Sequence, residues 1–283
     1  MQISALYLYP VKSLGGIAVN EAVVDAKGFQ HDRRFMLVDP NGIFITQRSN
    51  PHMALIDVSI ESDTLYVWHR HRPTDRLMLA LEPDATGLPT LPVTIWDSEN
   101  VSAVRVGAEA DRWFTNVLGK PCHLVFMPDS TRRTIDLTYA RHTDDAVSFA
   151  DGYPYLLIGQ ASLDDLNQRL PEPIGIERFR PNIVVSGSLP FAEDSWAHFR
   201  VGELDMYGVK PCARCILTTI DPATGQKGTE PLKTLAGYRQ WKHKILFGQN
   251  VLVEPNTSGL LRVGQSVTVV RQITPWLAAP SLS

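Results

Sequence analysis

The stretch Phe35-Met-Leu-Val-Asp-Pro-Asn-Gly-Ile-Phe-Ile-Thr46 contains two short apolar segments separated by a turn sequence. The segments from Phe35 to Val38 and from Ile43 to Thr46 are made largely of residues that favour strands. Between them, Asp39-Pro-Asn-Gly42 has the residues that hairpin turns prefer, because Asn, Asp and Gly tolerate positive φ or cap their own backbone. The stretch therefore predicts a β-hairpin.

Similar short apolar runs fill the first hundred residues, and Glu61-Ser-Asp63 supplies a second hairpin turn. Many short strands separated by turn residues are typical of a β-sandwich or a β-barrel. The remaining runs are Ile3 to Tyr9, Ala18 to Val24, Leu55 to Ile60, Leu65 to Trp68, Leu77 to Leu81 and Val93 to Trp96.

The first helical pattern runs from Ala108 to Leu118, where Trp113, Val117 and Leu118 can share one face and Gly119 is placed to cap the C-terminus. We place a domain boundary directly after this helix. The predicted division is a first domain at 1–120, a second domain at 121–272 and a tail at 273–283 that we expect to be frayed.

The second half also reads as mainly β, with a few short helices. Ser162-Leu-Asp-Asp165 resembles a capping box that opens a short helix, with Leu163, Leu166 and Leu170 on one side. A second short helix is expected from Pro231 to about Tyr238. The predicted strands are His123 to Phe126, Asn182 to Val185, Ile216 to Ile220 and Asn250 to Val253, with a terminal hairpin around Val263-Gly264-Gln265. The predicted fold class is mainly β, rich in β-barrel, of the α+β type.

Composition excludes several classes of function. The chain has 283 residues, a net charge of -3 and no long basic block, which argues against a nucleic-acid partner. We identify no secretory leader, and no stretch approaches the roughly 18 apolar residues of a membrane span. The three cysteines are too few for a disulfide scaffold. We therefore expect a cytoplasmic protein without a membrane partner.

The run Lys210-Pro-Cys-Ala-Arg-Cys-Ile-Leu-Thr-Thr-Ile-Asp-Pro222 is the strongest candidate for chemistry. A cysteine acts as a nucleophile or metal ligand only as the thiolate, and the neighbouring guanidinium of Arg214 stabilises that charged form. If the run is extended, Cys212 and Cys215 point to opposite faces, so only one thiol can enter a polar pocket. We expect one functional cysteine and one that packs.

Other interpretations of the two cysteines stay open at this point. A structural zinc site needs four ligands, and the chain has no second CxxC and no paired HxxxH. A thioredoxin-type pair needs a helix after its first cysteine, whereas Ile216 to Ile220 is strand-like. Both thiols could also be small buried hydrophobes.

Anion-binding groups stand next to turns in three further places: Pro10-Val-Lys-Ser-Leu-Gly-Gly16, His31-Asp-Arg-Arg-Phe35 and Phe179-Arg-Pro-Asn182. Lys12, Ser13 and the two glycines could hold a phosphate, although the spacing is not that of a P-loop and a solvated turn explains it equally well. Arg33 and Arg180 could equally make only surface ion pairs. The His69-Arg-His-Arg72 segment is interpreted as a solvated loop.

Separated segments along nearly the whole chain carry a resemblance to a known family. They are Tyr9-Pro-Val-Lys-Ser13, Asp32-Arg33, Thr46-Gln-Arg48, Phe149-Ala-Asp-Gly-Tyr-Pro154, Phe179-Arg-Pro-Asn-Ile183, the cysteine run and Phe247-Gly-Gln-Asn250. In this order they resemble the MOSC family, in the form of an N-terminal MOSC-associated β-barrel (1–120) followed by a MOSC domain (121–272). The chain is similar in kind to the mitochondrial amidoxime-reducing component and to bacterial molybdenum N-reductases, without the ferredoxin-like domain that some of the bacterial relatives append.

The resemblance implies a molybdenum cofactor (Mo-molybdopterin), a pterin with a dithiolene and a terminal phosphate. It implies that Cys215 is the metal ligand and the catalytic residue, and that Cys212 packs. The cofactor contacts that it implies are Lys12, Ser13, Arg33, Gly152, Tyr153, Arg180, Asn182, Ala213, Arg214 and Asn250. The residue types agree, since phosphate suits Lys, Arg and hydroxyl donors and a dithiolene-bound metal suits a soft thiolate.

The implied activity is reduction of N-hydroxylated compounds from N–OH to N–H, with oxygen transfer to molybdenum. Asp221 and His243 are candidate proton relays, each weighed against a turn cap or surface residue. The expected partners are a small N-hydroxylated substrate and a separate electron donor, either a flavoprotein or a protein of the ferredoxin or cytochrome type. No pyridoxal phosphate is expected. The alternatives are a sulfur carrier that holds a persulfide on Cys215, since MOSC domains occur in cofactor sulfurases, and a cofactor-binding storage module.

Overall fold

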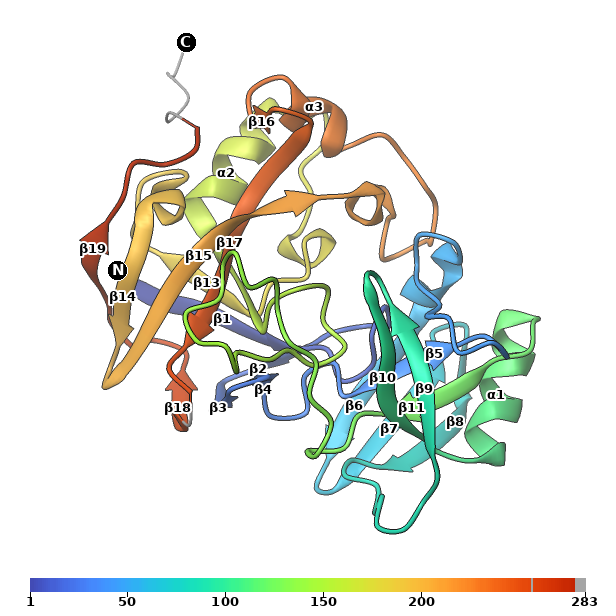
Figure 1. Ribbon diagram of the computed structural model, residues 1–283. Coiled ribbons are helices and arrows are strands. Elements are labelled where there is room, and N and C mark those ends of the chain that lie inside the picture. Colours follow the sequence, from blue (N-terminus) through green and yellow to red (C-terminus); the bar gives the residue numbers. More distant parts are fainter. Residues whose placement is uncertain (256, 278–283) are drawn as a thin grey trace.

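The computed structural model describes residues 1–255 and 257–277, so residues 278–283 of the predicted tail lie outside the described part. Strands dominate the chain, and the few helices are short, which confirms the mainly β prediction (Figure 1). No helix within the described residues has both the length and the apolar character needed to cross a bilayer.

The largest sheet joins the two ends of the chain. It has nine strands in the order β19-β14-β15-β17-β12-β13-β1-β2, with β16 paired to β17. Strand β1 is antiparallel to β13, and β12 is parallel to β13. The strands are β1 (Gln2–Leu8), β2 (Ile17–Val19), β12 (Tyr155–Gly159), β13 (Ile183–Ser186), β14 (Trp196–Val201), β15 (Leu204–Arg214), β16 (Gln240–Trp241), β17 (Lys244–Val253) and β19 (Val267–Gln272). The N-terminal strand is thus part of the same sheet as the cysteine-bearing strand.

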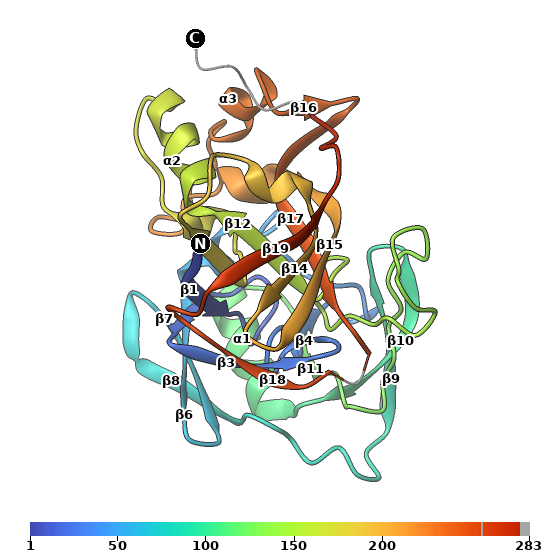
Figure 2. The ribbon, with the colours of Figure 1, turned by 90° about the vertical axis from the view of Figure 1, so that its left-hand side faces the viewer.

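Three smaller sheets are built mostly from the first half. One has the order β5-β11-β10-β9, another β6-β7-β8, and the third β18-β3-β4. Their strands are β3 (Glu21–Asp25), β4 (Gly28–Phe29), β5 (Phe35–Val38), β6 (Ile56–Glu61), β7 (Thr64–His69), β8 (Arg72–Ala80), β9 (Thr90–Ile95), β10 (Ser98–Arg105), β11 (His123–Phe126) and β18 (Gly259–Arg262). Figures 1 and 2 show β6, β8 and β9 at one end of the molecule and the helices α2 (Gln160–Arg169) and α3 (Leu232–Ala236) at the other.

Both predicted turns of the first half form. Asp39 Oδ1 accepts hydrogen bonds from the N–H groups of Asn41 and Ile43, and Gly42 has φ 79°. The segment from Ile43 to Thr46 is not a strand, however: it makes only isolated bridges, one of them from Ile43 to Thr94. It lies between β5, which contains Val38, and β9, which contains Thr94, and it forms a continuous strand pairing with neither. The second turn joins β6 to β7, whose register is fixed by the pair Glu61 and Thr64.

The helix α1 (Ala108–Leu118) has the predicted bounds, and Gly119 caps it in the left-handed conformation at φ 68°. Trp113, Val117 and Leu118 pack together against the core of the first half, as predicted. Leu163, Leu166 and Leu170 likewise share a core cluster with Leu235 of α3.

The predicted capping box at Ser162 is wrong. Helix α2 begins earlier, after Gly159, and the Ser162 hydroxyl donates to the buried carboxylate of Glu193. That hydroxyl also accepts a hydrogen bond from the N–H of Phe191. The side chain therefore serves a tertiary contact that the local sequence pattern does not reveal.

Two further predictions in the second half are wrong. Residues Ile216–Thr219 form a short 3-10 helix, because strand β15 ends before them at Arg214 and the Cys215 carbonyl accepts the N–H of Thr218. The turn near Gly264 does not close a hairpin: β18 pairs with β3, and β19 pairs with β14. The 3-10 turn changes where the second cysteine lies.

Candidate functional site

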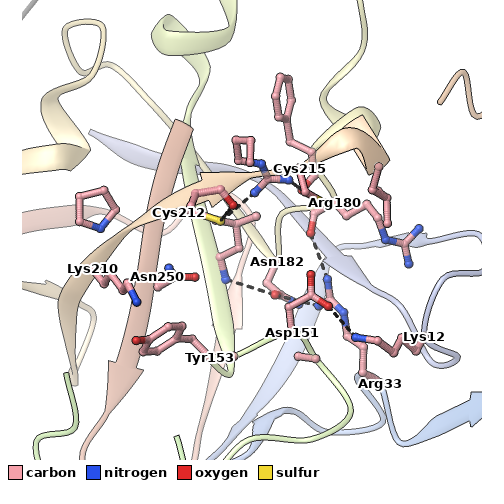
Figure 3. Close-up of a pocket in the computed structure, with 18 of the residues that line it drawn as sticks. Lys12, Arg33, Asp151, Tyr153, Arg180, Asn182, Lys210, Cys212, Cys215 and Asn250 are labelled. Carbon is pink, nitrogen blue, oxygen red and sulfur yellow. Dashed lines mark hydrogen bonds and ion pairs between the residues drawn. The ribbon is translucent and has the colours of Figure 1, made fainter. Parts of the chain in front are cut away.

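One cavity of about 250 Å³ collects side chains from distant parts of the chain (Figure 3). Every predicted cofactor contact and the predicted metal ligand line it. The lining residues are Lys12, Ser13, Arg33, Ala150, Asp151, Gly152, Tyr153, Leu156, Phe179, Arg180, Asn182, Lys210, Pro211, Cys212, Ala213, Arg214, Cys215, Leu217 and Asn250. The structure thus brings the predicted residues together, and their roles stay predictions.

Both cysteines of the run are among the residues that line this cavity, and the strand ends between them, so the extended run on which the expectation of opposite faces depended does not form. The register between β15 and β17 shifts between Pro211 and Ala213, and the strand ends at Arg214. Cys215 then precedes the 3-10 turn, whose Thr218 donates its N–H and its hydroxyl to the Cys215 carbonyl. Strict alternation of side chains fails where a bulge and a strand end occur within four residues.

Arg214 is fixed by the first cysteine of the run. Its Nη1 donates to Sγ of Cys212 over 2.9 Å, and its Nη2 donates to the Phe179 carbonyl over 2.7 Å. Burial raises the pKa of the Cys212 thiol, although the charge and hydrogen bond of Arg214 act to lower it. The nearby guanidinium therefore does not by itself make Cys212 a thiolate.

Lys12 is buried and bonded to the loop that follows Phe149. Its Nζ donates to the Phe149 carbonyl over 2.8 Å and to Asp151 Oδ1 over 2.6 Å. Burial lowers the pKa of Lys12 to about 8, while the Asp151 carboxylate acts in the opposite direction. Lys12 has three donors, and these two bonds leave one N–H for a ligand.

Asp151 was not among the predicted site residues. Burial alone would raise the pKa of its carboxyl group, but the Lys12 ammonium lowers it well below the ordinary value, with help from the indole N–H of Trp96. The sequence signal was present, because Asp151 belongs to the Phe149–Pro154 segment. Only the fold shows that it pairs with a lysine that precedes it by 139 residues.

Two arginines enclose a tyrosine beside Lys12. The guanidinium carbons of Arg33 and Arg180 lie 4.3 Å and 4.2 Å from the centre of the Tyr9 ring. Arg33 Nη1 donates to Asn182 Oδ1 over 2.9 Å, and Arg180 Nη1 donates to the Leu14 carbonyl over 2.6 Å. Burial lowers the pKa of Arg180 to about 10. These contacts hold two cationic side chains in place with little freedom.

Three of the lining residues have left-handed backbones: Ser13 at φ 68°, Arg33 at φ 50° and Arg180 at φ 55°. Residues other than glycine are uncommon in this region, and such conformations persist only where the surrounding structure imposes them. No pattern in the sequence predicts them. They lie in the three turn segments that the sequence identified as possible anion sites.

Arg133 does not line the cavity but is bonded to the loop that does, and no sequence motif pointed to it. It is 5% exposed, and it donates to the carbonyls of Ser148, Ala150 and Asp151 at 2.9, 2.7 and 2.7 Å. With the bond from Lys12 to the Phe149 carbonyl, four consecutive carbonyls from 148 to 151 accept from two buried cations. Arg133 thus fixes the loop that forms one wall of the cavity.

Several buried donors around the cavity have no partner among the described residues. They are Arg180 Nη2, Arg214 Nε and the Tyr153 hydroxyl. An unsatisfied buried donor costs about 1–3 kcal/mol, so such groups indicate a ligand with acceptor atoms. Four cationic side chains (Lys12, Arg33, Arg180 and Arg214) and two thiols therefore suit an anionic, phosphate-bearing ligand with a soft metal.

The candidate proton relays do not lie at the cavity. Asp221 Oδ1 accepts the N–H of Ala223 in a turn, and His243 is exposed. Neither is among the lining residues. Arg70 of the predicted solvated loop is bonded to Asp57 and donates to the Pro222 carbonyl over 2.8 Å.

Comparison with known proteins gives two family matches and several relatives. The MOSC N-terminal beta barrel domain matches residues 1–121, and the MOSC domain matches residues 144–268. Mitochondrial amidoxime-reducing component 1 of Mus musculus is 34% identical over 286 residues, covering 95% of this chain and 82% of the relative. The Homo sapiens protein of that name is 33% identical, covering 95% and 83%. Molybdenum cofactor sulfurase of Solanum lycopersicum is 31% identical, covering 94% of this chain and 35% of the relative.

Proposed function

The chain belongs to the family in which a MOSC N-terminal β-barrel domain precedes a MOSC domain, and from this premise we propose that it is a molybdenum-cofactor-dependent reductase of N-hydroxylated compounds. The observation that supports the proposal most is the meeting of both cysteines of the run with five buried or half-buried cationic residues in one cavity. The similarity to two amidoxime-reducing components over 95% of the chain supports the reductase reading.

The cofactor would be held at two places in this cavity. Lys12, Ser13, Arg33 and Arg180 would hold its phosphate, because they supply charged and hydroxyl donors from fixed positions. Cys215 would ligate the metal. Asn182, Ala213 and Arg214 line the wall between these places, while Gly152, Tyr153 and Asn250 stay predicted contacts.

When bound, the cofactor supplies the two-electron redox chemistry that converts N–OH to N–H. The protein's part is to bind and orient. The unpartnered donors Arg180 Nη2 and Arg214 Nε are available to a ligand's acceptor atoms. The bond from Arg214 to Cys212 keeps that thiol at the wall, so that Cys215 is the thiol left for the metal.

A second candidate function rests on the similarity to a molybdenum cofactor sulfurase. The chain matches about a third of that relative's length, at 31% identity. In this alternative, Cys215 would carry a persulfide and pass its sulfur on, and the cavity would hold the cofactor as the sulfur acceptor.

The reductase proposal also includes a domain division at 120–121, a cytoplasmic location and a separate electron-donor protein.

The test is reduction of benzamidoxime to benzamidine by the molybdenum-loaded protein, with reduced methyl viologen as the electron source. We expect turnover by the wild type and by Cys122→Ser, whose thiol is buried outside the cavity, and none by Cys215→Ser. Turnover by Cys215→Ser at the wild-type rate would overturn the assignment. Intact-mass detection of a persulfide on Cys215, without turnover, would favour the sulfur carrier.

A further inference from the structure

Lys210 lies at the end of the cavity away from Lys12 and Arg33. Figure 3 shows Lys210, Asn250 and Tyr153 together on the side opposite those two cations. Lys210 and Asn250 are paired residues of the neighbouring strands β15 and β17. The Lys210 ammonium lies 4.1 Å from the centre of the Tyr139 ring and 5.7 Å from that of Tyr153. We call Lys210, Asn250 and Tyr153 the Lys210 end.

The ammonium of Lys210, unlike the other cations of the cavity, has no hydrogen-bond or ion-pair partner in the part of the chain that the structure describes. Lys12 is paired with Asp151, Arg33 with Asp32, and Arg214 with a carbonyl and a thiol. Lys210 Nζ makes no hydrogen bond or ion pair with any residue in 1–255 or 257–277. Within the described residues the ammonium lies against the faces of two aromatic rings, and the Asp136 carboxylate attracts it without forming an ion pair, which leaves its N–H groups available.

The rest of the Lys210 end is also prepared for a polar ligand. The Tyr153 hydroxyl is buried and has no partner among the described residues. The Asn250 side chain also lines the cavity and makes no hydrogen bond with the part of the chain that the structure describes. A cation, a hydroxyl and an amide that make no hydrogen bond with the described residues, at one end of a cavity, indicate a ligand group with several acceptor atoms.

We propose that the Lys210 end is the substrate-binding part of the cavity, and that Lys210 binds a carboxylate or phosphate carried by the N-hydroxylated substrate. This inference rests on the proposed function, because the phosphate of the cofactor would occupy the other cations. We therefore expect the protein to prefer N-hydroxylated compounds that carry an anionic substituent. A lysine suits this role, because it offers a point charge with three donors on a flexible stem.

The test compares benzamidoxime with 4-carboxybenzamidoxime, which differ only in the carboxylate. The ratio of KM for benzamidoxime to KM for the carboxylated compound measures the preference. We expect Lys210→Met to lower this ratio about tenfold, as the loss of one charge-assisted hydrogen bond would do. Lys233→Met is the matched control, because Lys233 is an exposed lysine of α3 that does not line the cavity, and it should keep the wild-type ratio. An unchanged ratio in Lys210→Met would overturn the proposal.

A binding measurement separates this proposal from the proposed activity. Calorimetry with 4-carboxybenzamide and with benzamide, neither of which is N-hydroxylated, should show that Lys210→Met loses about tenfold in affinity for the carboxylated compound relative to the neutral one. If that loss occurs in a protein that reduces neither oxime, the site stands and the reductase assignment fails. If both amidoximes are reduced, and 4-carboxybenzamide binds equally well to the wild type and to Lys210→Met, the proposed role of Lys210 is wrong and the reductase assignment stands. Loss of molybdenum from Lys210→Met would assign Lys210 to the cofactor and overturn the proposal.

Discussion

Nη1 of Arg214 donates a hydrogen bond to Sγ of Cys212 over 2.9 Å. The arginine of the run is therefore bonded to the first cysteine, whereas the second cysteine is the proposed metal ligand. Burial raises the pKa of Cys212 against the opposing charge of Arg214. Cys212 is a thiol held in place beside the site, and its bond explains why an arginine stands between the two cysteines.

Replacing Arg214 with methionine tests this bond. Without the guanidinium, the Cys212 thiolate loses its nearest cation, so the pKa of Cys212 should rise further. Alkylation of Cys212 by iodoacetamide at pH 8 should then slow about tenfold for each unit of increase in the pKa. The rates are followed by mass spectrometry in a Cys215→Ser background, with and without Arg214→Met. The plateau rate at high pH controls for access to the thiol, and an unchanged pH profile would show that the bond does not stabilise the thiolate.

Lys12 makes anion binding sensitive to pH. Burial lowers its pKa to about 8, so it loses its charge in the folded protein above that pH. Inorganic phosphate, measured by calorimetry on cofactor-free protein, should bind up to about tenfold more weakly for each pH unit above 8. Lys12→Met should bind weakly with little dependence on pH in this range, and Lys244→Met should keep the wild-type profile. A wild-type profile that stays flat from pH 7 to 10 would exclude Lys12 from the anion site.

The lowered pKa of Lys12 also predicts how the free energy of unfolding changes with pH. The folded pKa of Lys12, about 8, lies below the ordinary value of 10.5. The folded protein therefore binds fewer protons than the unfolded chain between these values, and the free energy of unfolding should rise with pH in that window. Urea unfolding of the wild type should show this increase relative to Lys12→Met from pH 8 to 10.5. A decrease over the same window would contradict the shift.

Arg133 should matter through the backbone of the loop 148–151. In Arg133→Met three carbonyls lose their donor, and the free energy of unfolding should fall by about 3 kcal/mol. Hydrogen exchange at the amides from Ala150 to Tyr153 should accelerate, and molybdenum should be retained less well. Arg132→Met is the matched control, because that neighbouring side chain is 54% exposed and its one ion pair with a described residue is the 3.9 Å contact with Asp144. Equal effects of the two substitutions would show that Arg133 does not position the loop.

Local chemistry was enough to predict much of the fold. The helix that ends at Leu118 was predicted from its apolar face and its glycine cap, which depend on residues close in sequence. The same is true of the turns after Val38 and Glu61. The failures depend on distant partners. Ser162 has the residues of a cap, but buried Glu193 takes its hydroxyl. Ile216–Thr219 has β-branched residues but becomes a 3-10 turn where strand β15 ends.

The candidate site could be predicted as a set of residues but not as a geometry. Residue types and the family resemblance selected Lys12, Arg33, Arg180 and Cys215, and all of these line one cavity. The pairing of Lys12 with Asp151 and the left-handed backbones of the turns arise only when separate segments pack together. Arg133 stood outside every motif, because its partners are backbone carbonyls that carry no sequence signal.

Molybdenum content is the most direct test of the central claim that Cys215 ligates the metal of a molybdenum cofactor. Wild type, Cys215→Ser and Cys212→Ser are produced in a host that makes the cofactor, purified under reducing conditions and analysed for metal. We expect near-stoichiometric molybdenum in the wild type, a large loss in Cys215→Ser and retention in Cys212→Ser. Molybdenum retained in Cys215→Ser but lost from Cys212→Ser would contradict it and move the metal to the thiol that Arg214 holds.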